Sequence, residues 1–261
     1  METRNTNYMV TGNLPDEQTL QAEIAKLLDL LGFYTGTKGY SYIFHAILLS
    51  VRNRDLLNDI TEGLYQQIAT HFSTTSSNVE HAMKLAIELV IKKGNFDELS
   101  KLFPQLDASK KLTNSNVICR IADDILVRYG SITALYLADM DSINDEMFLQ
   151  CQQLTVKITD CLHRLRIPAN IRGFEYIRFA VFIAVYDVSI LEEITKRLYV
   201  EVGKKFNTPS TAVERAIRHA NWRSWDTKNP EAEMMFVWDI PKNSALIARI
   251  VDDMRIECKV S

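Results

Sequence analysis

The stretch KKFNTPSTAVERAIRHA, Lys204 to Ala220, predicts a turn followed by an amphipathic helix. Thr208 precedes Pro209, a pair typical of a helix start, because threonine can cap the first turn and proline at the first helical position gives up no hydrogen bond. The helix is therefore expected to begin near Pro209. Apolar residues then recur at helical spacing and predict its packed face, made of Val213, Ala216, Ile217 and Ala220.

The polar residues of this helix point away from that face. Arg215 and Arg218 offer guanidinium groups and Glu214 a carboxylate, which are groups that recognise base edges and phosphates in DNA. Further polar and basic residues flank them in the turn and on the helix. The candidate DNA-binding residues are Lys204, Lys205, Ser210, Thr211, Glu214, Arg215, Arg218 and His219.

The segment before this helix completes a helix-turn-helix pattern. Its apolar residues alternate at spacings of three and four, and Asn207-Thr208 then interrupts the period. From Lys196 to Arg223 there are seven Lys and Arg against two acids, a balance of +5 in a chain whose total is −3. Such a basic surface suits phosphate contact, because released counterions supply much of the sequence-independent affinity for DNA. Either helix alone is better interpreted as the solvated face of an amphipathic helix. Two adjacent helices with this geometry favour DNA binding instead.

The run from Ile171 to Ala220 resembles a known family through the segments IRGFEYIRFAV, LEEITKRLYVEVGKKFNT and VERAIRHA. It is similar to the C-terminal DNA-binding effector domain of the stage-zero sporulation master response regulator of endospore-forming bacteria. The resemblance extends more weakly to about Asn144 and Glu257. It implies an all-helical domain whose helix from Pro209 enters the major groove. Ala212, where the family has an arginine, and Pro209 in the turn depart from the family pattern and leave the operator open.

The chain also repeats itself. Shifted by 134 positions, residues 39–86 match residues 173–220 at 17 of 48 positions without a gap, and the last helix of each copy follows at an offset of 129. The predicted fold is therefore all-α, with two tandem helical-bundle domains that each contain a helix-turn-helix. We expect the domains at residues 1–130 and 131–261, joined by a connector from Gly130 to Ile143.

Helical periodicity, with few Gly and Pro, places the elements of both copies. The expected helices lie at about 15–32, 39–53, 55–72, 75–93, 95–103 and 114–129, then at 144–166, 173–187, 189–206, 209–224 and 243–257.

The first copy keeps the apolar pattern but not the basic face. Its window from Glu62 to Leu89 holds one Lys or Arg against three Glu, a balance of −2. His81 stands in place of Arg215, and Leu85 in place of His219. The first domain is therefore predicted to be a degenerate effector domain that still folds.

Composition excludes several other classes of protein. No segment is typical of a signal peptide or a membrane span, so we expect a cytoplasmic protein that does not enter the membrane. The four cysteines lie far apart and are expected to be reduced. No mechanism-bearing motif is present, so we expect no enzyme activity, cofactor or metal. Three acidic clusters are interpreted as solvated charge at helix ends: Asp123-Asp124, Asp139-Met140-Asp141 and Asp252-Asp253.

Two functional hypotheses remain from the sequence. The first is a sequence-specific regulator that binds double-stranded DNA through its second copy and pairs with itself or with a related regulator. The second is an interaction module that does not bind DNA and antagonises a related regulator. The chain is too short to add an α/β receiver domain, so control is expected from expression, a partner or a ligand.

Overall fold

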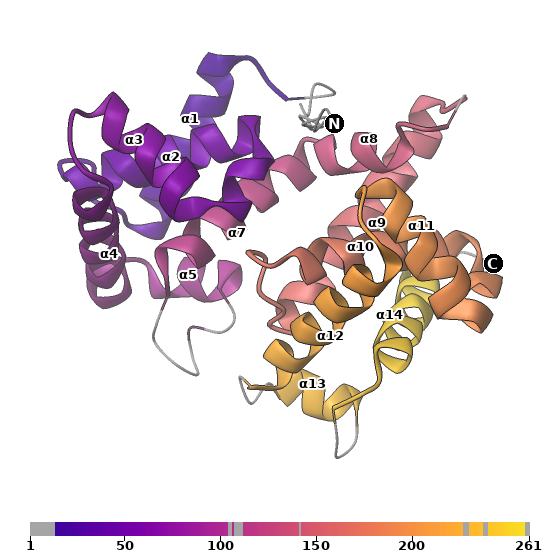
Figure 1. Cartoon of the computed structure of the whole chain (residues 1–261). Helices are drawn as coiled ribbons and strands as arrows, with labels where there is room; N and C mark the ends of the chain where they lie inside the picture. Colours follow the sequence, from indigo (N-terminus) through magenta and orange to yellow (C-terminus); the bar gives the residue numbers. More distant parts are fainter. Residues whose placement is uncertain are drawn as a thin grey trace, which may run out of the picture. The chain divides into compact units, whose positions relative to one another are not determined.

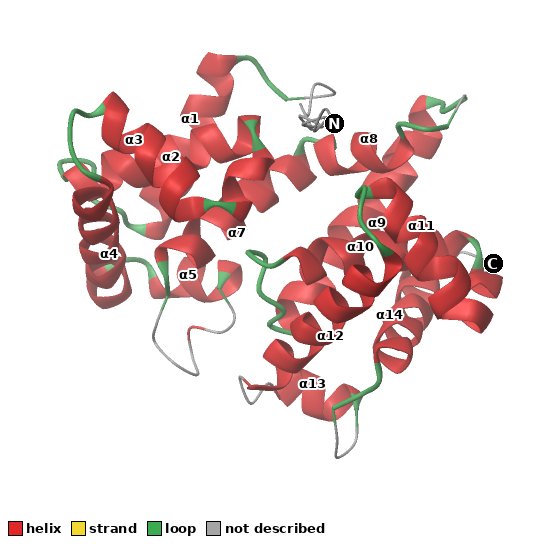
Figure 2. Cartoon of the chain, in the orientation of Figure 1, coloured by secondary structure: helices red, strands yellow, loops and turns green. Residues whose placement is uncertain are grey.

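The computed structural model describes residues 14–103, 106, 112–140, 142–226, 230–236 and 240–258. Within these ranges the regular elements are helices and none is a strand, which confirms the all-α prediction (Figures 1 and 2). The chain divides into two compact units, Met1–Leu135 and Tyr136–Ser261. We call them unit 1 and unit 2.

Unit 1 is built around α2, against which α1, α4 and α7 pack. Threonine side chains cap three of its helices: Thr37 begins α2, Thr75 begins α4 and Thr113 begins α7. The elements of unit 1, in chain order, are α1 (Glu17–Leu31), α2 (Lys38–Arg52), η1 (Arg54–Asn58), η2 (Ile60–Leu64), α3 (Tyr65–His71), α4 (Ser76–Lys93), α5 (Phe96–Leu102) and α7 (Asn114–Arg128).

Unit 2 repeats this arrangement around α10, which packs against α9, α12 and α14. Its elements are α9 (Asp145–Arg164), α10 (Arg172–Tyr186), η3 (Val188–Glu193), η4 (Ile194–Leu198), α11 (Tyr199–Lys205), α12 (Ser210–Asp226), α13 (Pro230–Met235) and α14 (Asn243–Cys258). The division between the units falls inside a further helix, α8 (Ser131–Leu137). The expected connector is thus partly helical, and buried residues such as Ile132 and Leu137 explain why.

Equivalent glycines hold the central helix of each unit against its neighbour. A Cβ atom on Gly39 of α2 would lie 2.3 Å from the Ala82 carbonyl oxygen of α4, and one on Gly173 of α10 would lie 2.2 Å from that of Ala216 in α12. Only glycine allows this approach of two helix backbones. The same contact at residues 134 apart shows that the internal repeat is also a repeat of packing.

Two expected helices differ from the structure in the same way. The segments predicted as single helices at 55–72 and 189–206 each consist of a 3₁₀ turn, a π turn and a short α-helix, η1–η2–α3 and η3–η4–α11. Apolar periodicity does not distinguish these hydrogen-bond patterns, because all three bury similar positions. The change in pattern at Ile60 and Ile194 is itself part of the repeat.

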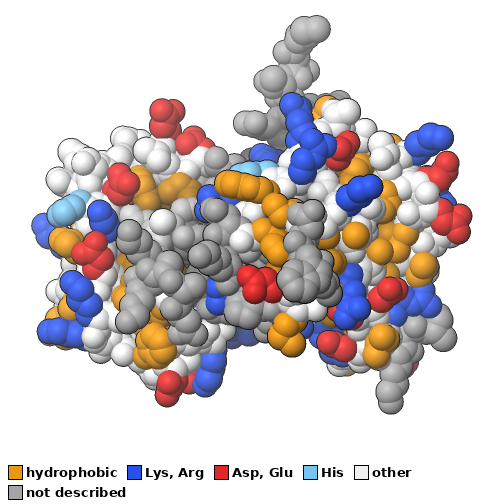
Figure 3. All heavy atoms as spheres, turned by 90° about the horizontal axis from the view of Figure 1, so that it is seen from below, with side chains coloured by type: hydrophobic (Ala, Val, Ile, Leu, Met, Phe, Trp, Pro, Cys, Tyr) orange, Lys and Arg blue, Asp and Glu red, His pale blue; other side chains and the backbone are white. Residues whose placement is uncertain are grey.

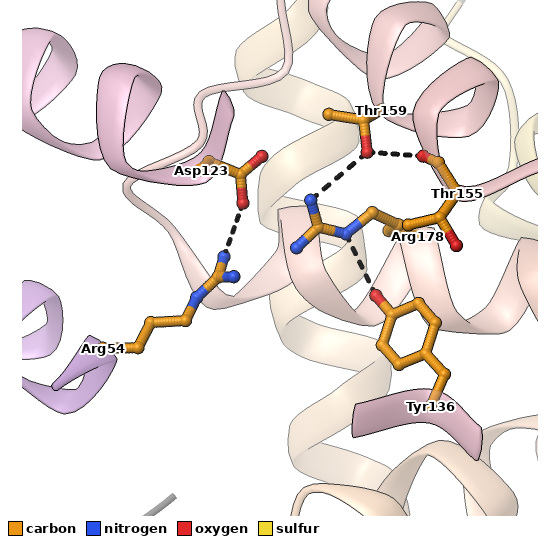
Figure 4. A network of polar contacts seen from close by, with 6 residues as sticks. All are labelled: Arg54, Asp123, Tyr136, Thr155, Thr159 and Arg178. Atoms are coloured by element: carbon orange, nitrogen blue, oxygen red, sulfur yellow. Dashed lines mark hydrogen bonds and ion pairs between the residues drawn. The ribbon is translucent and has the colours of Figure 1, made fainter. Parts of the chain in front are cut away.

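Each unit also buries a charged group that the other lacks (Figure 4). In unit 1, Asp123 of α7 is 1% exposed and accepts a hydrogen bond from Arg54 of η1 at 2.9 Å. The interpretation of Asp123 as solvated charge is therefore wrong. The local sequence did not indicate this pairing, because Arg54 lies 69 residues away along the chain. Asp124 does lie at the surface, where it pairs with Arg128, and Asp141 falls outside the described residues.

In unit 2 the buried charge is Arg178 of α10, which is 1% exposed. Its Nε donates to the Tyr136 hydroxyl at 3.0 Å, its Nη1 donates to Thr159 Oγ1 at 3.3 Å, and its guanidinium lies 5.2 Å from the Phe174 ring centroid. Thr159 in turn donates to the Thr155 carbonyl at 2.7 Å. The contacts join α8, α9 and α10, so Arg178 fixes the helices behind the helix-turn-helix.

Candidate nucleic-acid interface

The turn between α11 and α12 is closed by backbone hydrogen bonds and one left-handed residue. Asn207 has φ 47°, a conformation that asparagine tolerates better than most residues. The Thr208 amide donates to the Gly203 carbonyl at 2.9 Å, and the Val213 amide donates to that of Pro209 at 3.1 Å. The α-helix therefore begins at Ser210, and Pro209 occupies the cap, one residue later than predicted.

Three of the four residues predicted for the inner face of α12 are buried, and the fourth, Ala216, is half-buried. Val213, Ile217 and Ala220 are fully buried against α10 and the core. The side-chain amide of Asn243, at the start of α14, donates from Nδ2 to the Glu214 carbonyl at 3.2 Å, and the side chain of Asn114 makes the equivalent bond to the Glu80 carbonyl in unit 1 at 2.9 Å. These contacts fix both the rotation and the axial position of α12.

The outer face of α12 carries the predicted reading residues. Thr211, Arg215, Arg218 and His219 are exposed, and Glu214 is half-buried. Arg218 pairs with Glu214 one turn earlier, which orients its guanidinium along the helix. No hydrogen bond or ion pair engages Arg215 within the part of the chain that the structure describes. Arg215 is thus a guanidinium on this face that is available to a base or phosphate without breaking an internal hydrogen bond or ion pair.

The two lysines before the turn differ in availability. Lys204 extends into solvent and pairs with Glu201 on its own helix, Nζ to Oε1 at 2.7 Å. Lys205 has a side chain that is only 10% exposed, and its Nζ lies 2.7 Å from Oδ2 of Asp139. Ser210, the eighth candidate residue, is half-buried in a shallow hollow of about 440 Å³ that Lys204, Asn207 and Pro209 also line.

One exposed residue of this surface was missed from the sequence. Trp222 is 48% exposed and its ring stacks on His219, with 6.4 Å between centroids. With Arg218, Lys242 and Ser244 it lines a groove of about 490 Å³ between α12 and the start of α14. Trp222 lies on the same helical stripe as Thr211, Arg215 and Arg218, at spacings of three and four residues. The periodicity of the sequence alone could therefore have placed Trp222 on this surface.

The corresponding surface of unit 1 has different chemistry. On α4, His81, Lys84 and Leu85 occupy the positions of Arg215, Arg218 and His219, and all three are exposed. Next to the turn, His71 stacks on His45 with 4.2 Å between ring centroids, where unit 2 has Lys205 and Phe179. On the face drawn in Figure 3, basic and acidic side chains are interspersed rather than gathered in one field. The eight candidate residues all lie in α11 and α12.

Other kinds of site find no support in the described ranges. No group of three or more His, Cys, Asp or Glu side chains among those residues could hold a metal ion. All four cysteines are reduced, and burial raises the pKa of Cys161 to about 11, which keeps it a thiol. Within the residues that the structure places, we find no helix that could serve as a membrane span.

Comparison with known families matches both halves of the chain to one model, described as "Sporulation initiation factor Spo0A C terminal". The matches cover residues 24–125 and 158–254. They confirm the tandem duplication that the internal repeat predicted. The family is one of DNA-binding regulatory domains and is not a catalytic family.

Proposed function

The chain belongs to the family of the sporulation initiation factor Spo0A C-terminal domain, and from this premise we propose that unit 2 reads a DNA sequence in the major groove. In this proposal α12 is the recognition helix, as the second helix of a helix-turn-helix commonly is. Arg215 contacts a base edge, while Lys204 and the start of α12 contact phosphates. Glu214, Arg218 and His219 complete the reading face.

The observation that carries the proposal is the contrast at one position of the repeat. Arg215 is exposed and makes no hydrogen bond or ion pair within the described residues, whereas its counterpart in unit 1 is His81. An arginine on the outer face of a recognition helix can donate two hydrogen bonds to a guanine, which is the commonest specific contact in DNA complexes. We therefore propose that unit 1 is a degenerate copy that does not read DNA.

The test is a binding selection on random duplex DNA with the purified chain. We expect enrichment of one short motif, and expect the Arg215→Ala chain to lose preference at one position of it while still binding. A chain that enriches no motif, at low salt as well as at physiological salt, contradicts the proposal.

That negative result would favour an interaction module that pairs with a related regulator. One observation supports this second function, namely that Arg218 and Lys205 are already held by Glu214 and Asp139. Binding between the purified chain and a related effector domain, in the absence of DNA, would then be the experiment that supports it.

A further inference from the structure

The helix of unit 1 that corresponds to the recognition helix carries an unpartnered surface. Leu85 is 51% exposed and Leu89 is 37% exposed, one turn apart on α4. Lys84 and Glu88 flank them, and both are exposed. Although four residues separate them, Lys84 and Glu88 do not pair with each other, and neither contacts any other described side chain through an ion pair or hydrogen bond.

This pattern is complementary to itself. In an antiparallel pair of α4 helices, a two-fold axis beside residue 86 places Lys84 of each copy opposite Glu88 of the other. An axis beside residue 87 places Leu85 opposite Leu89, and the two axes differ by only about 1.5 Å along the helix. One two-fold operator therefore satisfies both the charged and the apolar contacts, as an isologous interface requires.

We propose that this α4 face, made of Lys84, Leu85, Glu88 and Leu89, is a contact between two copies of the chain. The contact consists of two cross-chain ion pairs around a small apolar centre. A single helix pair covers less than the roughly 800 Å² per partner of a standard stable interface, so the dimer is weak and concentration-dependent. Salt weakens it further, because the ion pairs are exposed.

The contact would give unit 1 a function other than DNA binding, for which it lacks the basic residues of unit 2. It would join two chains through their degenerate units and leave both α12 helices available. The association itself does not depend on DNA binding. Only its use in bringing two recognition helices to one operator rests on the proposed function.

The experiment is sedimentation of the full chain, without DNA, across roughly a hundredfold range of concentration at low salt. We expect the wild-type chain to shift reversibly from monomer to dimer as concentration rises. Lys84→Glu and Glu88→Lys should each raise the dimer dissociation constant about tenfold or more, because two attractive pairs per dimer become repulsive. Lys26→Glu, which reverses an exposed lysine on α1, is the matched control and should leave the association unchanged.

The decisive sample is an equimolar mixture of the Lys84→Glu and Glu88→Lys chains. In their heterodimer, the new glutamate at position 84 of the first chain faces the new lysine at position 88 of the second. The unchanged Glu88 of the first chain faces the unchanged Lys84 of the second. Both cross-chain pairs are therefore attractive again. Recovery of association in the mixture, when neither variant associates alone, supports the contact, because a change within one helix cannot be repaired by another chain. A wild-type chain that stays monomeric, or a mixture that fails to associate, overturns it. Neither outcome bears on DNA reading by unit 2.

Discussion

At the scale of single residues, Arg215 and Lys204 should differ in what they contribute to DNA binding. Arg215→Ala is expected to cost about 1–3 kcal/mol on the preferred site and to relax preference at one base pair, if its guanidinium forms paired hydrogen bonds with a guanine. Competition binding against sites with single substitutions measures both effects. If Arg215→Ala weakened all sequences equally, Arg215 would be a phosphate contact and not a reader.

Lys204→Ala should weaken all sequences alike. Lys204 is an exposed cation beside the turn, and a phosphate contact carries no sequence information. The salt dependence of the binding constant should also become shallower, by about one phosphate contact. Binding titrations on specific and random DNA at several salt concentrations measure this, and a change in base preference would contradict the assignment.

The ion pair of Lys205 could not be predicted from the sequence. Its spacing identified it as a cation next to the turn, but nothing in the spacing identified Asp139, 66 residues away, as its partner. Exposure of Arg215 followed from helical periodicity, because the opposite face of α12 was apolar. Pairing of distant charges depends on how helices pack, which a local pattern does not encode. The same reason explains the wrong interpretation of Asp123.

His45 should make unit 1 sensitive to acid. Burial, the neighbouring His71 and Arg52 lower the pKa of His45 below the ordinary value of 6.5. Below pH 6.5 the unfolded chain therefore binds a proton at His45 more readily than the folded chain does. The free energy of unfolding is unaffected by His45 above pH 6.5 and falls as the pH drops below this value. His45→Phe, which installs the residue found at the equivalent position 179, should reduce this loss. Urea unfolding at several pH values measures the difference, which should grow below pH 6.5 and not above it.

At the scale of helices, the glycine contacts determine how closely α12 can approach α10. A Cβ atom on Gly173 would lie 2.2 Å from the Ala216 carbonyl oxygen and 2.6 Å from the Ala220 Cβ atom, so Gly173→Ala must displace one backbone. We expect a loss of at least about 1–3 kcal/mol in stability, as for other overpacked cores. We also expect weaker DNA binding, because the recognition helix moves.

Gly39→Ala is the matched control, since it creates the same clash between α2 and α4 in unit 1. It should cost similar stability and leave the DNA affinity of the chain unchanged. Thermal unfolding and DNA titration well below the melting temperature separate the two effects. Equal loss of DNA affinity in both variants would show that the closeness of α10 and α12 has no special part in binding.

The helices themselves were largely predictable, and their interruptions were not. Periodic burial of residues such as Val213 and Ile217 located α12 to within a residue of its start. The 3₁₀ and π turns at η3 and η4 could not be predicted from that pattern, because these turns and an α-helix bury similar positions. The helix α8 lies between the two copies of the repeat, where the sequence predicts a connector, so the repeat gave no indication of it.

At the scale of the whole molecule, duplication does not imply two readers. The repeat gives both units the same contacts between helices, as the side-chain hydrogen bonds from Asn114 to α4 and from Asn243 to α12 show. The window of unit 1 nevertheless has a charge of −2 where that around α12 is basic. Glu80 and Glu88 on α4 would face phosphates if unit 1 docked as we propose for unit 2. Repulsion should therefore keep α4 off the duplex.

We consequently expect each chain to occupy one half-site, so that a paired operator needs two chains with half-sites about 10–10.5 base pairs apart or a multiple of that spacing. Footprinting combined with stoichiometric titration on a defined operator measures the number of half-sites protected per chain. Arg218→Ala should weaken protection, whereas Lys84→Ala should leave a single half-site unaffected, because α4 does not touch it. If one chain protects two adjacent half-sites, and if Lys84→Ala weakens protection as much as Arg218→Ala does, then unit 1 reads DNA despite its acidic window. The charge difference between the units would then have to serve another purpose.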